Sequence, residues 1–221
     1  MTPSSMMLPY ANLRQEPGIE NLGGVEALWY TPASNLLAFP QRGPLTIAQL
    51  QLRPGAVWYQ LVSVRGSVRF TQPAKDYGRH GSGFSPKLTG SLARHTPELA
   101  AGLEHMEGGR YVVLYRDLNG EVQLVGTPEH PLEWRDSYSA GSETQRNGFD
   151  WTLAGEALRR ARPYLGTWEV AEYGQQSGVV LQPGAGGTVQ LRTAGGRRLA
   201  TVPAGKTLVL KSGFKLSYQI L

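Results

Sequence analysis

The sequence predicts a mainly β protein: an antiparallel β-sandwich with one flanking α-helix, plus a small β-rich domain at the C-terminus. Two observations carry this prediction. Short runs that alternate apolar and polar residues recur along the chain, as expected for strands that bury one face. Most of the 28 Gly and 15 Pro among the 221 residues lie between these runs, where the chain must turn. A single segment has a clear helical periodicity.

Residues 1–24 are rich in Pro and Gly and have no regular periodicity, so we expect an extended N-terminal arm. Strand patterns begin directly after it, and we assign residues 25–165 to the β-sandwich domain. Turn signals such as Pro54-Gly55 bound its first strands, and the isolated Gly66 predicts a bulge or bend. The expected strands are VEALWY (25–30), LTIAQLQL (45–52), VWYQLVSV (57–64) and SVRF (67–70).

Residues 71–96 interrupt this rhythm with a polar, glycine-rich and basic run that has no clear periodicity. Connections of this length are uncommon in compact domains and are usually functional or disordered. We therefore predict a long loop that becomes ordered against a partner. Its candidate inter-subunit residues are Lys75, Tyr77, Arg79, Phe84, Lys87 and Arg94.

The predicted helix begins after Thr96, which is a suitable N-cap. Pro97 occupies the first helical position, where its missing N–H would have no intrahelical partner. Gly108-Gly109 marks the end of the helix. The apolar stripe consists of Leu99, Leu103 and Met106, at i, i+4 and i+7. We expect a short helix that lies across a sheet.

The clearest unit of the chain follows the helix over residues 110–156. Asn119-Gly120 is a strong hairpin signal because both residue types tolerate positive φ, and a second Asn-Gly lies at 147–148. We predict a four-stranded antiparallel meander with one buried face. Its strands are RYVVLYRD (110–117), EVQLVG (121–126), PLEWRDSYS (131–139) and GFDWTLAGE (148–156).

EALRRAR (156–162) predicts a short helical turn that ends at Pro163, and we place a domain boundary near residues 163–167. Beyond it, short strand patterns between glycine-containing breaks predict a small β accessory domain over residues 166–221. This domain holds six of the 22 basic residues and two of the 17 acidic ones, so most of the net charge of +5 is C-terminal. Two interpretations stay open: a patch that faces an acidic partner such as nucleic acid, or a solvated basic face.

No pattern in the sequence specifies catalysis or a cofactor. The absence of cysteine excludes disulfides, thiol catalysis and thiolate metal sites. The four histidines lack metal-ligand spacing, and a run at 200–207 that is similar to a phosphate-binding loop continues as a strand pattern instead of a helix. No apolar run is long enough for a membrane span, and the N-terminal residues lack a signal-peptide pattern. We therefore predict no enzymatic activity, no cofactor, no metal and no membrane association.

The run 110–156 resembles the closing meander of bacteriophage tail tube proteins and related tail components. In that pattern a helix is followed by a hairpin with an Asp/Asn-Gly turn, and the next strand ends in a small-residue bend. An Arg-Asn-Gly-aromatic-x-aromatic strand then ends in Gly-Glu. The matching residues here are RNGFDW at 146–151 and GE at 155–156. The resemblance extends more loosely over residues 25–156.

This resemblance implies a structural protein of the virion tail, assembled in the cytoplasm of the bacterial host. It implies that copies of the chain form rings, hexameric in the family, which stack into a tail tube and contact other tail proteins. DNA passes through such a tube only as cargo. In the family a long loop and an N-terminal arm reach adjacent rings, which indicates residues 71–96 and 1–24 here. Residues 166–221 depart from the minimal family pattern and are implied to be an accessory domain.

Two other classes of function stay open. One is a carbohydrate- or surface-binding β module of a baseplate or receptor-binding type, in which tryptophans line an exposed face. The strand contexts of these tryptophans favour packing inside the protein or between subunits. The other class is an enzyme with a carboxylate pair that lies outside any motif. The five tryptophans are Trp29, Trp58, Trp134, Trp151 and Trp168.

Overall fold

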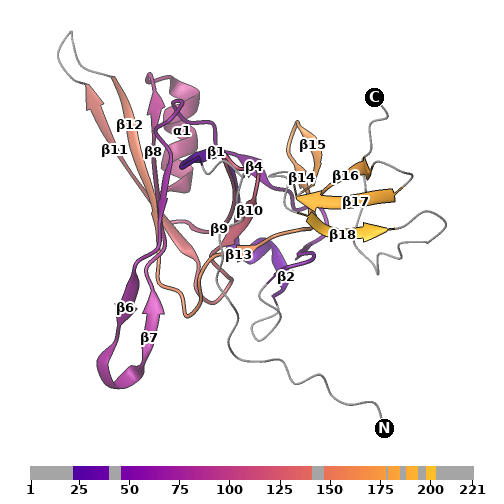
Figure 1. The fold of residues 1–221 in the computed structure, drawn as a ribbon. Coiled ribbons are helices and arrows are strands. Elements are labelled where there is room, and N and C mark those ends of the chain that lie inside the picture. The colour runs from indigo at the N-terminus through magenta and orange to yellow at the C-terminus, as the bar shows by residue number, and fades with distance from the viewer. Residues whose placement is uncertain are drawn as a thin grey trace.

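A computed structural model of the protein describes residues 22–39, 46–140, 147–177, 179–184, 188–193 and 198–202. Over these residues the fold is mainly β, with one α-helix and antiparallel sheets that stay open instead of closing into a barrel (Figure 1). The predicted fold class is confirmed. Most of the expected N-terminal arm, residues 1–21, lies outside the described residues, as do the strand patterns expected after residue 202.

The main sheet has nine antiparallel strands. Their bounds are β1 (Val25–Pro32), β4 (Tyr59–Gln60), β5 (Arg69–Thr71), β8 (Lys87–Ala93), β9 (Arg110–Asp117), β10 (Val122–Val125), β11 (Leu132–Ala140), β12 (Asn147–Ala154) and β13 (Arg162–Pro163). The order along the sheet is β13-β10-β9-β11-β12-β8-β5. β1 pairs with β9 along the edge opposite β10, and β4 pairs with β1. The sheet therefore branches at β9.

Smaller antiparallel sheets surround the main one. They pair β2 with β3, β6 with β7, β14 with β15, and β16 with β17 and β18. The bounds of these elements, with two short 3-10 turns, are β2 (Leu36–Ala38), β3 (Gln51–Leu52), β6 (Ala74–Asp76), β7 (Ser82–Phe84), β14 (Thr167–Val170), β15 (Gly174–Ser177), β16 (Val179–Gly184), β17 (Thr188–Thr193), β18 (Arg198–Val202), η1 (Ala33–Asn35) and η2 (Gly78–His80). The last three strands agree with the expected β-rich C-terminal region.

The helix α1 (Pro97–Met106) forms where the sequence predicts it. Thr96 caps it, because the Oγ1 of this side chain accepts a hydrogen bond at 3.2 Å from the backbone N–H three residues further on. Gly108, just past the helix, has a φ of +67°, which suits a glycine terminator. Leu103 and Met106 are buried, so the apolar stripe of the helix packs against the sheet.

Strand β9 is buried on both faces and lies between two hydrophobic clusters. Tyr111, Val113 and Tyr115 point into the first cluster, and Val112 and Leu114 point into the second. A strand that is covered on both faces requires a continuous apolar run instead of alternation. The run YVVLY meets this requirement and makes β9 the central strand of the fold.

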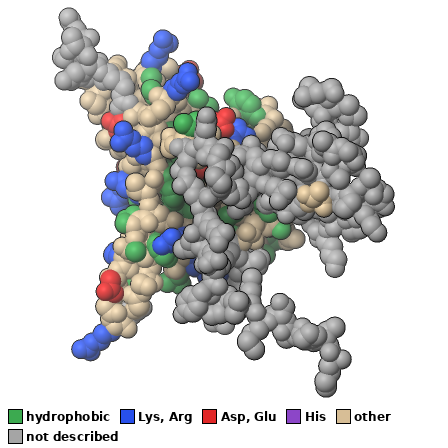
Figure 2. All heavy atoms as spheres, in the orientation of Figure 1, with side chains coloured by type: hydrophobic (Ala, Val, Ile, Leu, Met, Phe, Trp, Pro, Cys, Tyr) green, Lys and Arg blue, Asp and Glu red, His purple; other side chains and the backbone are tan. Residues whose placement is uncertain are grey.

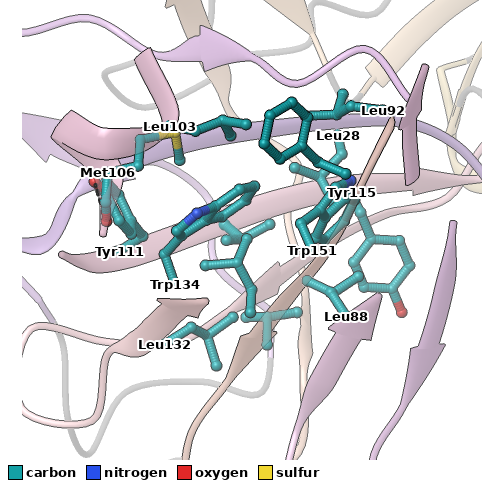
Figure 3. Close-up of a cluster of buried hydrophobic side chains, with 14 residues drawn as sticks. Leu28, Leu88, Leu92, Leu103, Met106, Tyr111, Tyr115, Leu132, Trp134 and Trp151 are labelled. Carbon is teal, nitrogen blue, oxygen red and sulfur yellow. Dashed lines mark hydrogen bonds between the residues drawn. The ribbon is translucent and has the colours of Figure 1, made fainter. Parts of the chain in front are cut away.

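The first hydrophobic cluster lies beneath α1 and contains residues of β8, β9, β11 and β12 (Figure 3). Within it Trp134 and Trp151 stack, with ring centroids 5.5 Å apart and planes inclined by 15°. The indole Nε1 of Trp151 donates a hydrogen bond to Ser63 Oγ at 3.0 Å. Gly90 faces this ring so closely that a Cβ atom would lie 2.5 Å from it. The stacked pair therefore depends on glycine at this position of β8.

The second hydrophobic cluster joins β1, β9 and β10 to residues distant in the sequence. Trp58, Trp168 and Val170 are all buried in it. The backbone N–H of Trp58 donates to the carbonyl of Glu169, and the N–H of Ala171 donates to the carbonyl of Trp58, both at 2.8 Å. Strand β14 is thus part of the packing of the main sheet.

This packing runs through the position near residues 163–167 where the sequence suggested a domain boundary. Tyr164 is buried, and its hydroxyl donates to the carbonyl of Thr167 at 3.0 Å. The N–H of Ile47 donates to the carbonyl of Pro163 at 2.9 Å. The helical turn expected at 156–162 is wrong, because this segment is extended chain and bends that hydrogen-bond to neighbouring elements.

The long loop predicted at residues 71–96 is also wrong, because most of it is strand. β6 and β7 form a hairpin, and β8 pairs with both β12 and β5. The inward positions of β8 are Leu88, Gly90 and Leu92. Since glycine occupies the middle inward position, the sequence does not show the alternation that identifies a strand.

The strands of the predicted meander form, but their order differs. β11 pairs with β9, and β10 pairs with β13 on its other side. Asn147 and Gly148 lie inside β12 instead of in a turn, and a Cβ on Gly148 would lie 2.1 Å from the carbonyl oxygen of Leu92. The turn between β9 and β10 forms as predicted, and Gly120 has a positive φ there. Asp117 Oδ1 stabilises this turn because it accepts hydrogen bonds from two of its backbone N–H groups.

Candidate functional site

The six predicted inter-subunit residues lie in two different parts of the molecule. Four of them belong to the hairpin of β6, η2 and β7 (residues 74–84), which we call the projecting hairpin: Lys75, Tyr77, Arg79 and Phe84. Figure 1 shows this hairpin extending from the main sheet in the direction opposite to the β11–β12 hairpin. Lys87 begins β8, and Arg94 follows the other end of β8, about 23 Å away along an extended strand.

An ion pair and a hydrogen bond connect the projecting hairpin to the chain that follows β12. Lys75 Nζ contacts Glu156 Oε1, and the hydroxyl of Tyr77 donates to Glu156 Oε2 at 3.0 Å. The hydrogen bond from Lys75, with that from Tyr77, lowers the pKa of the Glu156 carboxyl, and the same contact raises the pKa of Lys75. Lys75 and Glu156 are exposed, so this contact orients the hairpin more than it stabilises the fold.

Acid is expected to release this contact. Because the pKa of Glu156 is lowered in the folded protein, the contact is intact above the ordinary glutamate pKa of about 4.3 and is lost as the pH falls through the lowered value. An NMR titration of the Tyr77 ring signals should therefore show a transition with a midpoint below about 4.3. The variant Glu156→Gln should lack this transition, and its persistence there would contradict the assignment.

Glu156 belongs to the segment 155–162, which carries three arginines and which we call the arginine segment. Phe84 of β7 and Ala157 of the arginine segment exchange two backbone hydrogen bonds, at 2.8 and 2.9 Å. The side-chain amide of Gln72 also binds the segment twice, donating to the carbonyl of Arg159 at 3.4 Å and accepting a backbone N–H at 2.9 Å. These bonds hold the arginine segment against β7 and the residue that follows β5.

A hollow of about 310 Å³ lies beside the arginine segment, and we call it the arginine hollow. The arginine segment, the end of β10 with its following turn, and Phe39 contribute to its walls. Arg162 is only 7% exposed and its guanidinium carbon lies 5.3 Å from the ring centroid of Phe39, whereas Arg159 and Arg160 are exposed. Burial, together with the charge of Arg159, lowers the pKa of Arg162.

Sequence reasoning missed both Glu156 and the arginines that line this hollow. The sequence pattern EALRRAR predicts a helical turn and no binding site. The available signal was the density of arginine in RRAR at 159–162. The hydrogen bonds that gather this segment against residues about 70 to 90 positions earlier in the chain have no local signature.

The far end of β8 forms a separate surface around Arg94. This residue has a φ of +67°, and its N–H donates to the carbonyl of Asn147 at 3.1 Å. The ring of His95 stacks on Phe149 with centroids 5.5 Å apart, and the half-exposed ring of Tyr138 lies 5.0 Å from Phe149. Arg94 therefore belongs with the β11–β12 hairpin and not with the projecting hairpin.

The five tryptophans are all buried, each with 3% exposure or less, so none of them can stack on a sugar at the surface. Within the ranges that the structure describes, no group of three or more His, Asp or Glu side chains is arranged to hold a metal ion. The one helix found there, α1, is too short to cross a membrane.

Two surfaces thus stand out, the projecting hairpin and the arginine hollow. The first offers exposed strand edges and charged side chains, and the second is a concave site that three arginines line. Comparisons with family models, with curated proteins and with solved structures found no significant match to this chain.

Proposed function

We propose that this protein is a structural subunit that assembles with its own copies into rings, which stack into the tail tube of a bacteriophage. The resemblance of residues 110–156 to tail tube proteins and the exposed projecting hairpin support this proposal. The rings are hexameric, as in the family that the sequence resembles, and other tail proteins contact the tube. DNA is its passing cargo, and the subunit itself catalyses no reaction. The tube belongs to the virion and is assembled in the cytoplasm of the host bacterium.

The observation that carries this proposal is the exposure of the projecting hairpin. All three residues of β6 are exposed, and β6 and β7 pair only with each other among the described strands. A single two-stranded hairpin is marginally stable at best in water. The projecting hairpin extends about 15 Å beyond the sheet, estimated from its strand length. It is therefore suited to packing on a second copy of the chain.

A continuous strand edge leads from the main sheet into this hairpin. β5 is the last strand of the main sheet, and only Gln72 and Pro73 separate it from β6. Unpaired strand edges offer backbone N–H and C=O groups to another chain, and proteins limit unwanted pairing by keeping such edges short and charged. β5 has three residues and begins with the exposed Arg69. This edge fits regulated pairing between identical subunits.

Charge gives this surface a further means of selecting a partner. Figure 2 shows Lys and Arg side chains along the side of the molecule that ends in the projecting hairpin. The exposed basic residues of β5, the projecting hairpin and the start of β8 are Arg69, Lys75, Arg79 and Lys87. Charges at the rim of an interface mainly set its register and its association rate, and salt screens them. Self-association through this surface should therefore depend on the ionic strength.

Microscopy and mass measurement of the full chain test the proposal. Light scattering after size-exclusion chromatography should show an assembled species whose share grows with protein concentration and changes with the salt concentration. Negative-stain images of that species should show rings, and stacks of rings at the highest concentration. A chain that stays monomeric at every concentration and salt level would contradict the proposed function.

A further inference from the structure

We propose that the arginine hollow binds a small polyanion, that is, a molecule with at least two phosphate or carboxylate groups. This hollow adjoins the base of the projecting hairpin, since Gln72 lines it and Phe84 bonds to the arginine segment, but ligand binding and self-association are measured separately, so the two proposals can fail independently. Its walls combine the arginine segment with the turn after β10, and three arginines line it together with one acidic residue, Glu129. The described lining therefore has a positive excess.

Two of the three guanidinium groups contact aromatic rings from different parts of the fold. The guanidinium of Arg160 lies 5.2 Å from the ring centroid of Phe84, on β7. That of Arg162 lies 5.3 Å from the ring of Phe39, which follows β2. Cations over aromatic rings are attracted by the negative ring face, which restricts where the arginine side chain can go. Arginine so placed can present its planar donors to an oxyanion in a defined geometry.

Arg162 gives the site a buried positive charge. It is 7% exposed, and its own burial and the nearby charge of Arg159 both disfavour its protonated form. Placing like charges together in a poorly solvated place has an electrostatic cost. An anion bound between these groups interacts favourably with both of them. A dianion does so more effectively than chloride, because each of its charged groups can face a guanidinium.

The walls of the arginine hollow are fixed before a ligand arrives. Gln72 and Phe84 hold the arginine segment through the hydrogen bonds described above. The opposite turn is closed by two bonds between Thr127 and His130, each 3.0 Å long. A site that is already formed loses less conformational entropy when it binds. Binding should therefore not require a rearrangement of the main sheet.

The size and lining of the hollow limit the ligand class. A volume of about 310 Å³ lies at the lower end of ordinary small-molecule sites. Leu124 and Val125 provide an apolar wall, and the exposed Leu158 lies at the rim. Pyrophosphate and citrate match this space and charge, and they distinguish phosphate from carboxylate as the source of the negative groups. Duplex DNA is too wide to enter it.

Calorimetric titration of the full chain with pyrophosphate and with citrate, at constant ionic strength, tests this inference. At least one of the two should bind with one site per chain. Arg160→Gln should weaken that binding about tenfold, because it removes a charge-assisted contact, and Arg159→Gln/Arg160→Gln should weaken it further. Arg65→Gln removes one exposed arginine away from the hollow and should change the affinity less than about twofold.

The variants are chosen so that a folding defect does not hide the answer. Arg159 and Arg160 are exposed, so their replacement should leave the circular dichroism spectrum and Tm in chloride unchanged. Leu158→Glu, which adds a negative charge at the rim, should also weaken binding. The inference is overturned if neither probe binds at millimolar concentration. It is equally overturned if Arg65→Gln reduces the affinity as much as Arg160→Gln, since binding would then be a non-specific charge effect.

Discussion

Gly90→Val is expected to lower the free energy of unfolding by about 3 kcal/mol or more, the upper end of the range for overpacking a core. Even a Cβ atom at this position would lie 2.5 Å from the ring of Trp151, and valine adds two further methyl groups. Trp151 would have to leave its stack on Trp134 and its hydrogen bond to Ser63. Urea unfolding followed by tryptophan fluorescence measures this loss.

A matched glycine gives the opposite expectation. Gly102 lies on the exposed side of α1, and a Cβ there would have no neighbour within 4 Å. Gly102→Ala should therefore raise the free energy of unfolding, by up to about 1 kcal/mol, because alanine favours the helix. If Gly90→Val were no more harmful than Gly102→Ala, the packing described for Trp151 would be incorrect.

The local signals of the sequence predict the elements of this fold better than their arrangement. The helix is predicted correctly because its cap, its apolar stripe and its terminal glycine all lie within a few residues of one another. Strand β8 is missed because Gly90, at its centre, contributes space instead of a side chain. The pairing of β11 with β9 depends on contacts between distant parts of the chain, which no local pattern contains.

In the candidate site, too, local properties can be predicted from the sequence but contacts between distant residues cannot. The polar and basic character of residues 71–96 correctly indicates exposed chain at Lys75 and Arg79. The same composition does not show that Phe84 turns toward its own arginine segment, where it lies under Arg160. Nor does it show that Lys75 and Tyr77 meet Glu156, because about 80 residues separate them. Charge and exposure can be predicted from composition, whereas the partners of each group need the fold.

Shortening the projecting hairpin is expected to abolish self-association while the subunit stays folded. The change replaces residues 76–82 with Asn-Gly, so that the register pair Lys75 and Gly83 closes a two-residue turn. Phe84 and its backbone bonds to Ala157 are kept, so the arginine segment retains its support. Because the removed residues whose burial is described are exposed or half-buried, the free energy of unfolding should change by less than about 1 kcal/mol.

The expected loss of assembly follows from geometry. At this end of the molecule, the tip of the hairpin reaches furthest from the main sheet (Figure 1). No other described part of the shortened chain extends as far at this end, so none can replace the contacts that the tip makes with a neighbouring copy. Light scattering should find the shortened chain monomeric at concentrations where the full chain assembles. The control Arg79→Lys keeps both the length and the charge of the tip, and it should assemble. If the shortened chain still formed rings, the tip of the projecting hairpin would not be the inter-subunit contact that assembly requires.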